Sequence, residues 1–152
     1  MRLVVDASVG VKWLVPEPLS DRALAILEDF GDGRVELYAP RVFTLEVASA
    51  LRKYCVRGLV ERGLVAESLR VLRDIDIAYV EVGWDLVDEA LSYSLEKGVT
   101  VYDAVYIVTA RKLKARLVTA DERLYRALRS KEPALLFLGD YRRAPQACEP
   151  DR

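Results

Sequence analysis

The chain has 152 residues, a length that suits one domain with a full hydrophobic core. Hydrophobic residues make up 52% and charged residues 31% of the sequence, a balance that is typical of a globular protein and excludes an intrinsically disordered one. The net charge of −1 provides no global positive field for nucleic acid. Histidine is absent, which excludes Ser–His triads, a histidine general base and the usual zinc ligands.

The first strand is expected at the N-terminus, and the segment that contains it does not resemble a signal peptide. Asp6 and Lys12 interrupt its apolar run, and no stretch of the sequence approaches the roughly 20 apolar residues of a membrane helix. We therefore expect a cytoplasmic protein. Cys55 and Cys148 form no CxxC pattern, so the sequence indicates no zinc site. The sequence leaves open whether the two cysteines form one long-range disulfide. Asparagine is absent and Gln146 is the only glutamine, which favours a thermophilic source.

Short apolar runs alternate with helical patterns along the chain. Strands are expected at residues 3–5, 35–39, 77–82, 116–119 and 135–138. Helices are expected at residues 8–14, 20–30, 41–56, 60–73, 84–97, 101–114 and 121–130. This alternation predicts a three-layer α/β/α sandwich with a central, mainly parallel sheet of five strands. We expect residues 1–140 to form this domain and residues 141–152 to form a flexible tail.

Two aspartates occupy positions that a solvated surface charge does not explain. Open α/β sheets bind ligands beyond the carboxyl ends of their strands, and Asp6 directly follows the first strand in LVVDAS. It could belong to a site or cap the next helix. Asp103 is the only charged residue in GVTVYDAVYIVTA. A capping box with Thr100 would explain its place but not its apolar surroundings, so we favour a functional role for Asp103.

Two further acids fit ordinary roles when each is taken alone. Asp121 follows a strand in RLVTADERL, where a capping box of Thr119 and Glu122 would place it in the first helical turn. Glu46 has Ala50, not a basic residue, four positions later, and an isolated helix glutamate usually faces water. If the sheet gathers the acids at one edge, their repulsion requires a cation. Oxygen ligands suit Mg²⁺ or Mn²⁺, and with substrate phosphate they describe a nuclease site.

Four stretches resemble the PIN-domain ribonucleases, particularly the VapC-type toxins of prokaryotic toxin–antitoxin pairs. They are VVDAS, TLEVASAL, TVYDAVYIVTA and LVTADERL, and the resemblance runs from residue 1 to about residue 138. It implies an endoribonuclease of single-stranded RNA that uses Mg²⁺ or Mn²⁺. The family's acidic quartet corresponds to Asp6, Glu46, Asp103 and Asp121, and its small hydroxyl residue to Thr119. The resemblance also implies a homodimer and a cognate antitoxin protein that occupies the acidic cleft.

Basic residues near these acids are candidates for holding the RNA backbone, although basic residues at helix ends also simply interact with the helix dipole. The candidates are Lys12, Arg52, Lys53, Arg57, Arg111, Lys112, Lys114 and Arg116. Asp-x-Asp phosphatases and receiver domains also place acids at strand ends, but position 8 is Ser and no acidic pair follows the first strand. A housekeeping RNA-processing nuclease and a catalytically silent PIN-like binding module stay open as alternative functions.

Overall fold

A five-stranded sheet lies at the centre of the protein, whose computed structural model describes residues 1–145. The strands are β1 (Arg2–Val5), β2 (Glu36–Pro40), β3 (Ala78–Val80), β4 (Arg116–Thr119) and β5 (Leu135–Phe137). They are arranged in the order β3-β2-β1-β4-β5, and every neighbouring pair is parallel. The predicted α/β class and the five predicted strands are confirmed, and the sheet is parallel throughout.

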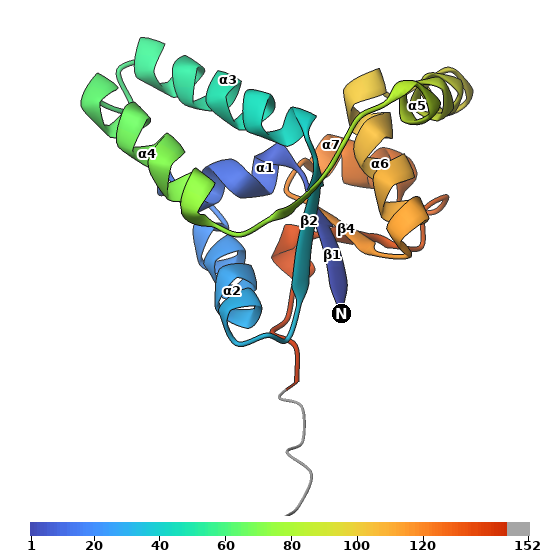
Figure 1. Cartoon of the computed structure of the whole chain (residues 1–152), viewed down its shortest axis with the longest axis horizontal. Coiled ribbons are helices and arrows are strands. Elements are labelled where there is room, and N and C mark those ends of the chain that lie inside the picture. Colours follow the sequence, from blue (N-terminus) through green and yellow to red (C-terminus); the bar gives the residue numbers. More distant parts are fainter. Residues whose placement is uncertain (146–152) are drawn as a thin grey trace, which may run out of the picture.

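Helices cover both faces of this sheet. They are α1 (Ala7–Gly10), α2 (Ser20–Gly31), α3 (Val42–Val56), α4 (Arg62–Asp74), α5 (Trp84–Lys97), α6 (Val101–Leu113) and α7 (Glu122–Leu128), with short 3₁₀ turns η1 (Val11–Trp13) and η2 (Leu138–Asp140). Figure 1 shows α1 to α4 on one side of the strands and α5 and α6 on the other. Because parallel crossovers are right-handed, reversing direction across the sheet after β3 moves the following helices to the opposite face. The predicted three-layer sandwich is thus confirmed.

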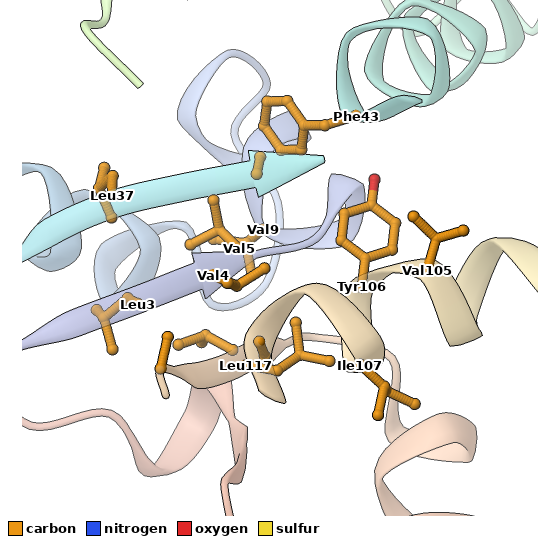
Figure 2. Close-up of a cluster of buried hydrophobic side chains, with 14 of the residues drawn as sticks. Leu3, Val4, Val5, Val9, Leu37, Phe43, Val105, Tyr106, Ile107 and Leu117 are labelled. Atoms are coloured by element: carbon orange, nitrogen blue, oxygen red, sulfur yellow. The ribbon is translucent and has the colours of Figure 1, made fainter. Parts of the chain in front are cut away.

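The central strand is buried on both faces. Leu3, Val4 and Val5 of β1 have no exposed surface, and Figure 2 shows them among side chains that include Phe43 of α3 and Ile107 of α6. A strand covered by helices on both faces gains from apolar residues at every position, which explains why the sequence reads as an unbroken apolar run. This rigid strand delivers the residue that follows it to a fixed place at the edge of the sheet.

Gly10 allows α1 to approach α3 closely. A Cβ atom at this position would lie 2.5 Å from Cζ and 2.8 Å from Cε2 of Phe43, whose ring is fully buried. No real Cβ tolerates such contacts, so glycine sets the spacing between these helices. Asp6 precedes α1 and Glu46 lies in α3, so this close packing also sets how near the two acids stand.

The segment that follows η2 packs against α2, and the flexible tail expected from residue 141 stays a prediction. Tyr141 is 1% exposed, and its hydroxyl donates to Oδ2 of Asp29 at 2.6 Å. The backbone N–H of Ala144 donates to the same oxygen at 2.7 Å, and Arg34 pairs with Oδ1 at 2.8 Å. Burial of an aromatic ring and a shared carboxylate hold residues 141–145 in place. The rest of the expected tail, including Cys148 and its pairing with Cys55, lies outside the described residues.

Within residues 1–145, the helices are all too short or too polar to cross a membrane. The cytoplasmic location stays a prediction.

Candidate active site

The acidic residues singled out in the sequence line one pocket at the carboxyl edge of the sheet. The strand order reverses between β1 and β4, the point at which open α/β sheets bind ligands. Asp6 follows β1 directly, and Asp121 follows β4 after one intervening residue. Glu46 in α3 and Asp103 in α6 complete the acidic lining of a cavity of about 560 Å³. Four residues distant in sequence are therefore brought together by the topology of the sheet.

Asp6 is the most buried of these acids, with 7% of its surface exposed. It caps α1 by accepting a hydrogen bond from the backbone N–H of Val9 at 3.3 Å, and it accepts another from the hydroxyl of Ser8. Burial raises the pKa of Asp6 to about 6, against the opposing effect of hydrogen bonds from Ser8, Thr119 and Val9. The helix-cap and site interpretations of this residue are compatible, because the same carboxylate faces the pocket.

Asp103 lies at the electrostatic centre of the group. Burial raises the pKa of Asp103, hydrogen bonding to Thr100 lowers it, and the charge of Asp121 raises it further. The charge of Asp103 in turn raises the pKa values of Asp6 and Glu46, in each case after burial as the larger cause. The expected cap is present as well, since Thr100 Oγ1 accepts from the backbone N–H of Asp103 at 3.1 Å. The Asp103 carboxylate thus lies in the apolar surroundings noted in the sequence and close enough to the other acids to interact with them electrostatically.

Glu46 points into the pocket, not into solvent. It is half-buried, and its Oε2 accepts a hydrogen bond from the hydroxyl of Tyr106 at 2.5 Å. Tyr106 is a buried residue of α6 that also lines the pocket, and Figure 2 shows its ring beyond the end of β1. The sequence did not identify Tyr106 as part of the site. The available signal was a tyrosine hydroxyl in the largely apolar stretch of residues 104–110, three positions after Asp103.

Asp121 caps α7 itself. Its Oδ1 accepts from the backbone N–H groups of Arg123 at 2.9 Å and Leu124 at 3.1 Å, so Asp121 and not Thr119 is the N-cap, and the expected capping box of Thr119 and Glu122 does not form. Thr119 is fully buried and lies behind the acids. Its Oγ1 accepts from the backbone N–H of Asp121 at 3.1 Å, and its hydrogen bond to Asp6 stabilises the charged form of that carboxylate. Thr119 therefore connects the two acids at the reversal point.

Ser8 is a second residue that the sequence analysis did not place in the site. Its hydroxyl donates to Asp6, lies 3.5 Å from Oγ1 of Thr119 and accepts from the backbone N–H of Ala120 at 2.8 Å. These contacts fasten the end of β1 to the loop after β4. The position of Ser8, two residues after an acid at a strand end, was the available signal.

The charge of Arg123 lowers the pKa of Asp103, but the four acids otherwise have no basic partner in the part of the chain that the structure describes. None takes part in an ion pair there, although most other buried or half-buried acids do. As the side chains stand, each carboxylate is turned toward a local donor, and among residues 1–145 no three acids converge in a metal-binding arrangement. The donor set of four carboxylates without His or thiolate nevertheless has the charge and chemistry that a hard divalent cation requires.

The basic candidates divide into two groups. Lys53 and Arg57 line the pocket. The other candidates do not line the pocket, so the prediction that they meet the RNA near the acids lacks support. Three of them are paired with acids: Lys12 with Glu17 at 2.9 Å, Arg111 with Glu132, and Lys112 with Glu89 at 2.9 Å. Arg52 is exposed on α3 away from the pocket. Lys114 caps the far end of α6 and Arg116 begins β4, at the opposite edge of the sheet.

The fold and the pocket together define a parallel α/β protein with a carboxylate site at its topological switch point. The family model of the PIN domain matches residues 3–129 of the chain. Ribonuclease VapC3 of Pyrobaculum aerophilum is 34% identical over 137 residues, which cover 90% of this chain and 98% of that relative. The chain therefore belongs to the PIN-domain family.

Solved structures agree with this assignment at the level of the fold. PAE2754 from Pyrobaculum aerophilum matches with a TM-score of 0.66 and 24% identity, covering 91% of this chain and 90% of that one. A chain of a toxin–antitoxin complex from Klebsiella pneumoniae matches with a TM-score of 0.60 and 15% identity, covering 90% of this chain and 97% of that one. The resemblance stated from the four acidic stretches is confirmed.

Proposed function

We propose that the chain is a metal-dependent endoribonuclease that hydrolyses single-stranded RNA, and that it acts as the VapC-type toxin of a toxin–antitoxin pair. The observation that carries this proposal is the gathering of four carboxylates around one pocket, from four places in the fold and without an ion pair among residues 1–145. Membership of the PIN family and the similarity to a VapC ribonuclease support the same activity.

Mg²⁺, with Mn²⁺ as a substitute, fits this pocket as the cofactor. Asp6 and Asp103 are the first choice as direct ligands, and Glu46 and Asp121 bind directly or through water. All four residues already line the pocket, so we expect ligation to need rotation of side chains and no change of fold. When bound, such a cation lowers the pKa of a water molecule and neutralises charge on the phosphate. Burial is the main cause that raises the pKa values of three of the acids, and the cation also relieves the mutual repulsion that raises them further.

The chain's own groups prepare this site. Ser8, Thr119 and the N–H of Val9 hold the Asp6 carboxylate, Tyr106 holds Glu46, and the first turn of α7 holds Asp121. These hydrogen bonds favour the charged forms of the acids, which are the forms that bind a cation. The absence of histidine leaves no side chain with an ordinary pKa near neutrality to serve as general base, so activation of water falls to the carboxylate site.

The test is cleavage of a labelled single-stranded RNA by the purified protein with Mg²⁺, with Mn²⁺ and with EDTA. We expect cleavage that needs the metal, stops with EDTA and is lost in Asp103→Asn. Cleavage that persists in EDTA would contradict the metal mechanism. A protein that binds RNA but does not cleave it under any of these conditions would instead be the catalytically silent module.

A cognate antitoxin separates the toxin role from a housekeeping one. Expression of the chain should arrest growth of a host cell, and co-expression of a small protein encoded beside it should relieve the arrest. Growth that is unaffected by an RNA-cleaving chain would favour the housekeeping nuclease. The Klebsiella pneumoniae relative is itself part of a toxin–antitoxin complex, which supports the search for such a partner.

We also propose a homodimer. Trp84, Leu91 and Leu95 of α5 follow helical spacing that places them on one face, and Trp84 is 88% and Leu95 78% exposed. A row of large apolar side chains in water is costly unless a partner covers it, and a second copy offers the same row in return. Light scattering should give the mass of a dimer for the wild type and of a monomer for Leu95→Glu. A wild-type monomer would contradict this assembly.

A further inference from the structure

Helix α3 carries a line of pocket residues that begins with an acid and continues with basic residues. Glu46, Ala50, Lys53 and Arg57 are separated by four, three and four positions, which places them on one side of the helix and of the cap that ends it. All four line the acidic pocket. With a rise of 1.5 Å per residue, Lys53 lies about 10 Å and Arg57 about 16 Å beyond Glu46 along the helix axis.

Both basic residues on this line are available to a ligand. Each is exposed, and within residues 1–145 neither forms an ion pair. Arg111 and Lys112, by contrast, are paired with Glu132 and Glu89 near the far end of α6. Of the basic residues on these two helices, those free to meet a phosphate chain beside the pocket therefore lie on α3. Arg123 of α7 acts on Asp103 through its charge but does not line the pocket. This asymmetry was not visible in the sequence, where basic residues followed both Glu46 and Asp103.

Tyr54 adds an aromatic side chain to the same wall of the pocket. Its hydroxyl donates to Oε2 of Glu17 at 2.5 Å, and Oε1 of Glu17 accepts from Nζ of Lys12 at 2.9 Å. The Lys12 and Glu17 side chains are largely buried, at 13% and 17% exposure. Lys12 thus neutralises Glu17, which holds the Tyr54 hydroxyl. The Tyr54 ring is therefore fixed by an acid whose negative charge is paired and does not repel a nearby phosphate. Aromatic rings fixed beside basic residues are the platforms on which unpaired bases stack.

We propose that α3 forms a one-sided RNA-binding track, in which Lys53 and Arg57 hold phosphates and Tyr54 stacks on a base of the strand that leaves the acidic pocket. The track binds single-stranded RNA on one side of the scissile phosphate and leaves the other side with few contacts. The track rests on the proposed RNA-cleaving function. It deepens that function by naming the side of the acidic pocket along which the RNA strand runs.

The test measures binding of a fluorescein-labelled oligouridine by anisotropy, as a function of salt. The protein carries Asp103→Asn to prevent cleavage, and the wild type in EDTA provides a second non-cleaving form. Lys53→Gln and Arg57→Gln should each weaken binding and reduce the slope of log K against log salt by about 0.7, the value for one phosphate contact on a single strand. Arg52→Gln is the matched control, because Arg52 lies on the same helix but outside the pocket, and it should leave both quantities unchanged.

Tyr54 is tested by a pair of substitutions in the same assay. Tyr54→Leu should weaken binding by about 5- to 150-fold with an unchanged salt slope, because loss of stacking involves no charge. Tyr54→Phe keeps the ring and should retain most of the affinity. Equal effects of Arg52→Gln and Lys53→Gln, or an unaltered affinity of Tyr54→Leu, would overturn the track while leaving the cleavage activity intact. Wild-type protein that neither binds nor cleaves RNA would overturn both proposals.

Discussion

Replacing Asp6 by Asn should make the metal-free protein more stable at neutral pH while removing its response to metal. Asp6 is buried, and its pKa rises from an ordinary 3.8 to about 6. A carboxyl with a raised pKa in the folded state stabilises the protein when protonated. That stability is fully present below pH 3.8 and is lost as the pH rises through about 6.

The size of the effect follows from the two pKa values. A rise from 3.8 to about 6 corresponds to about 3 kcal/mol at neutral pH. Asn retains the side-chain oxygen that caps α1 through the N–H of Val9, so the substitution removes the charge and keeps the cap. A gain of 3 kcal/mol raises the melting temperature by about 6–12 °C in a chain of this length.

Thermal unfolding followed by circular dichroism in EDTA measures this gain. Asp6→Asn should melt above the wild type at about pH 7.5, and the difference should shrink as the pH falls toward 4. Mn²⁺ should raise the melting temperature of the wild type and not that of Asp6→Asn, since a ligand bound by the native state stabilises it. An Asp6→Asn protein that melts below the wild type in EDTA at about pH 7.5 would refute the reasoning.

Asp29→Asn is the matched control, because Asp29 is also buried but has two arginines, Arg34 and Arg143, among its donors. Burial alone would raise the pKa of Asp29, but hydrogen bonds from Tyr141 and the N–H of Ala144, with those from Arg34 and Arg143, hold it down at about 2. Removing its charge should therefore destabilise the fold by about 1.5–3 kcal/mol, the range for hydrogen bonds to a charged group. Two buried aspartates then change stability in opposite directions.

Three further substitutions and conditions test the site. Tyr106→Phe removes the hydroxyl that holds Glu46 and should weaken Mn²⁺ binding and RNA cleavage by about 10- to 100-fold. The control Tyr93→Phe removes an equivalent hydroxyl from Glu132 outside the pocket and should leave both quantities unchanged. Equal effects of the two substitutions would show that the loss is structural. Gly10→Ala should lower the melting temperature, because its Cβ would strike the Phe43 ring, and an unchanged melting curve would count against the close packing of α1 on α3. Calorimetry should show Mn²⁺ affinity falling below about pH 6, where Asp6 takes up a proton, and a flat profile between pH 5 and 8 would argue against Asp6 as a ligand.

The sequence was sufficient for the sheet and for the positions of the acids at its edge. Each strand is a short apolar run between clear helical patterns, and the carboxyl ends of parallel strands necessarily meet at one edge. Asp6 and Asp121 could therefore be placed from their position after β1 and β4. Their capping of α1 and α7 shows that a local structural role and a site role do not exclude each other.

Contacts between distant elements were beyond the sequence. The orientation of Glu46 depends on the hydroxyl of Tyr106, which lies 60 positions away on the opposite side of the sheet. Whether a basic residue is free also depends on distant acids, since Arg111 is paired across 21 positions with Glu132. The packing of residues 141–145 follows from the burial of Tyr141 against Asp29. No periodic pattern in the sequence predicts this contact.

Direct titration of the metal-free protein with Mn²⁺ tests the central claim, that the four carboxylates form the metal site of a nuclease. Isothermal calorimetry should detect binding to the wild type, with affinity lost in Asp6→Asn and in Asp103→Asn and retained in Asp29→Asn, whose carboxylate lies outside the pocket. Binding that is absent from the wild type, or that survives unchanged in both Asp6→Asn and Asp103→Asn, would contradict it.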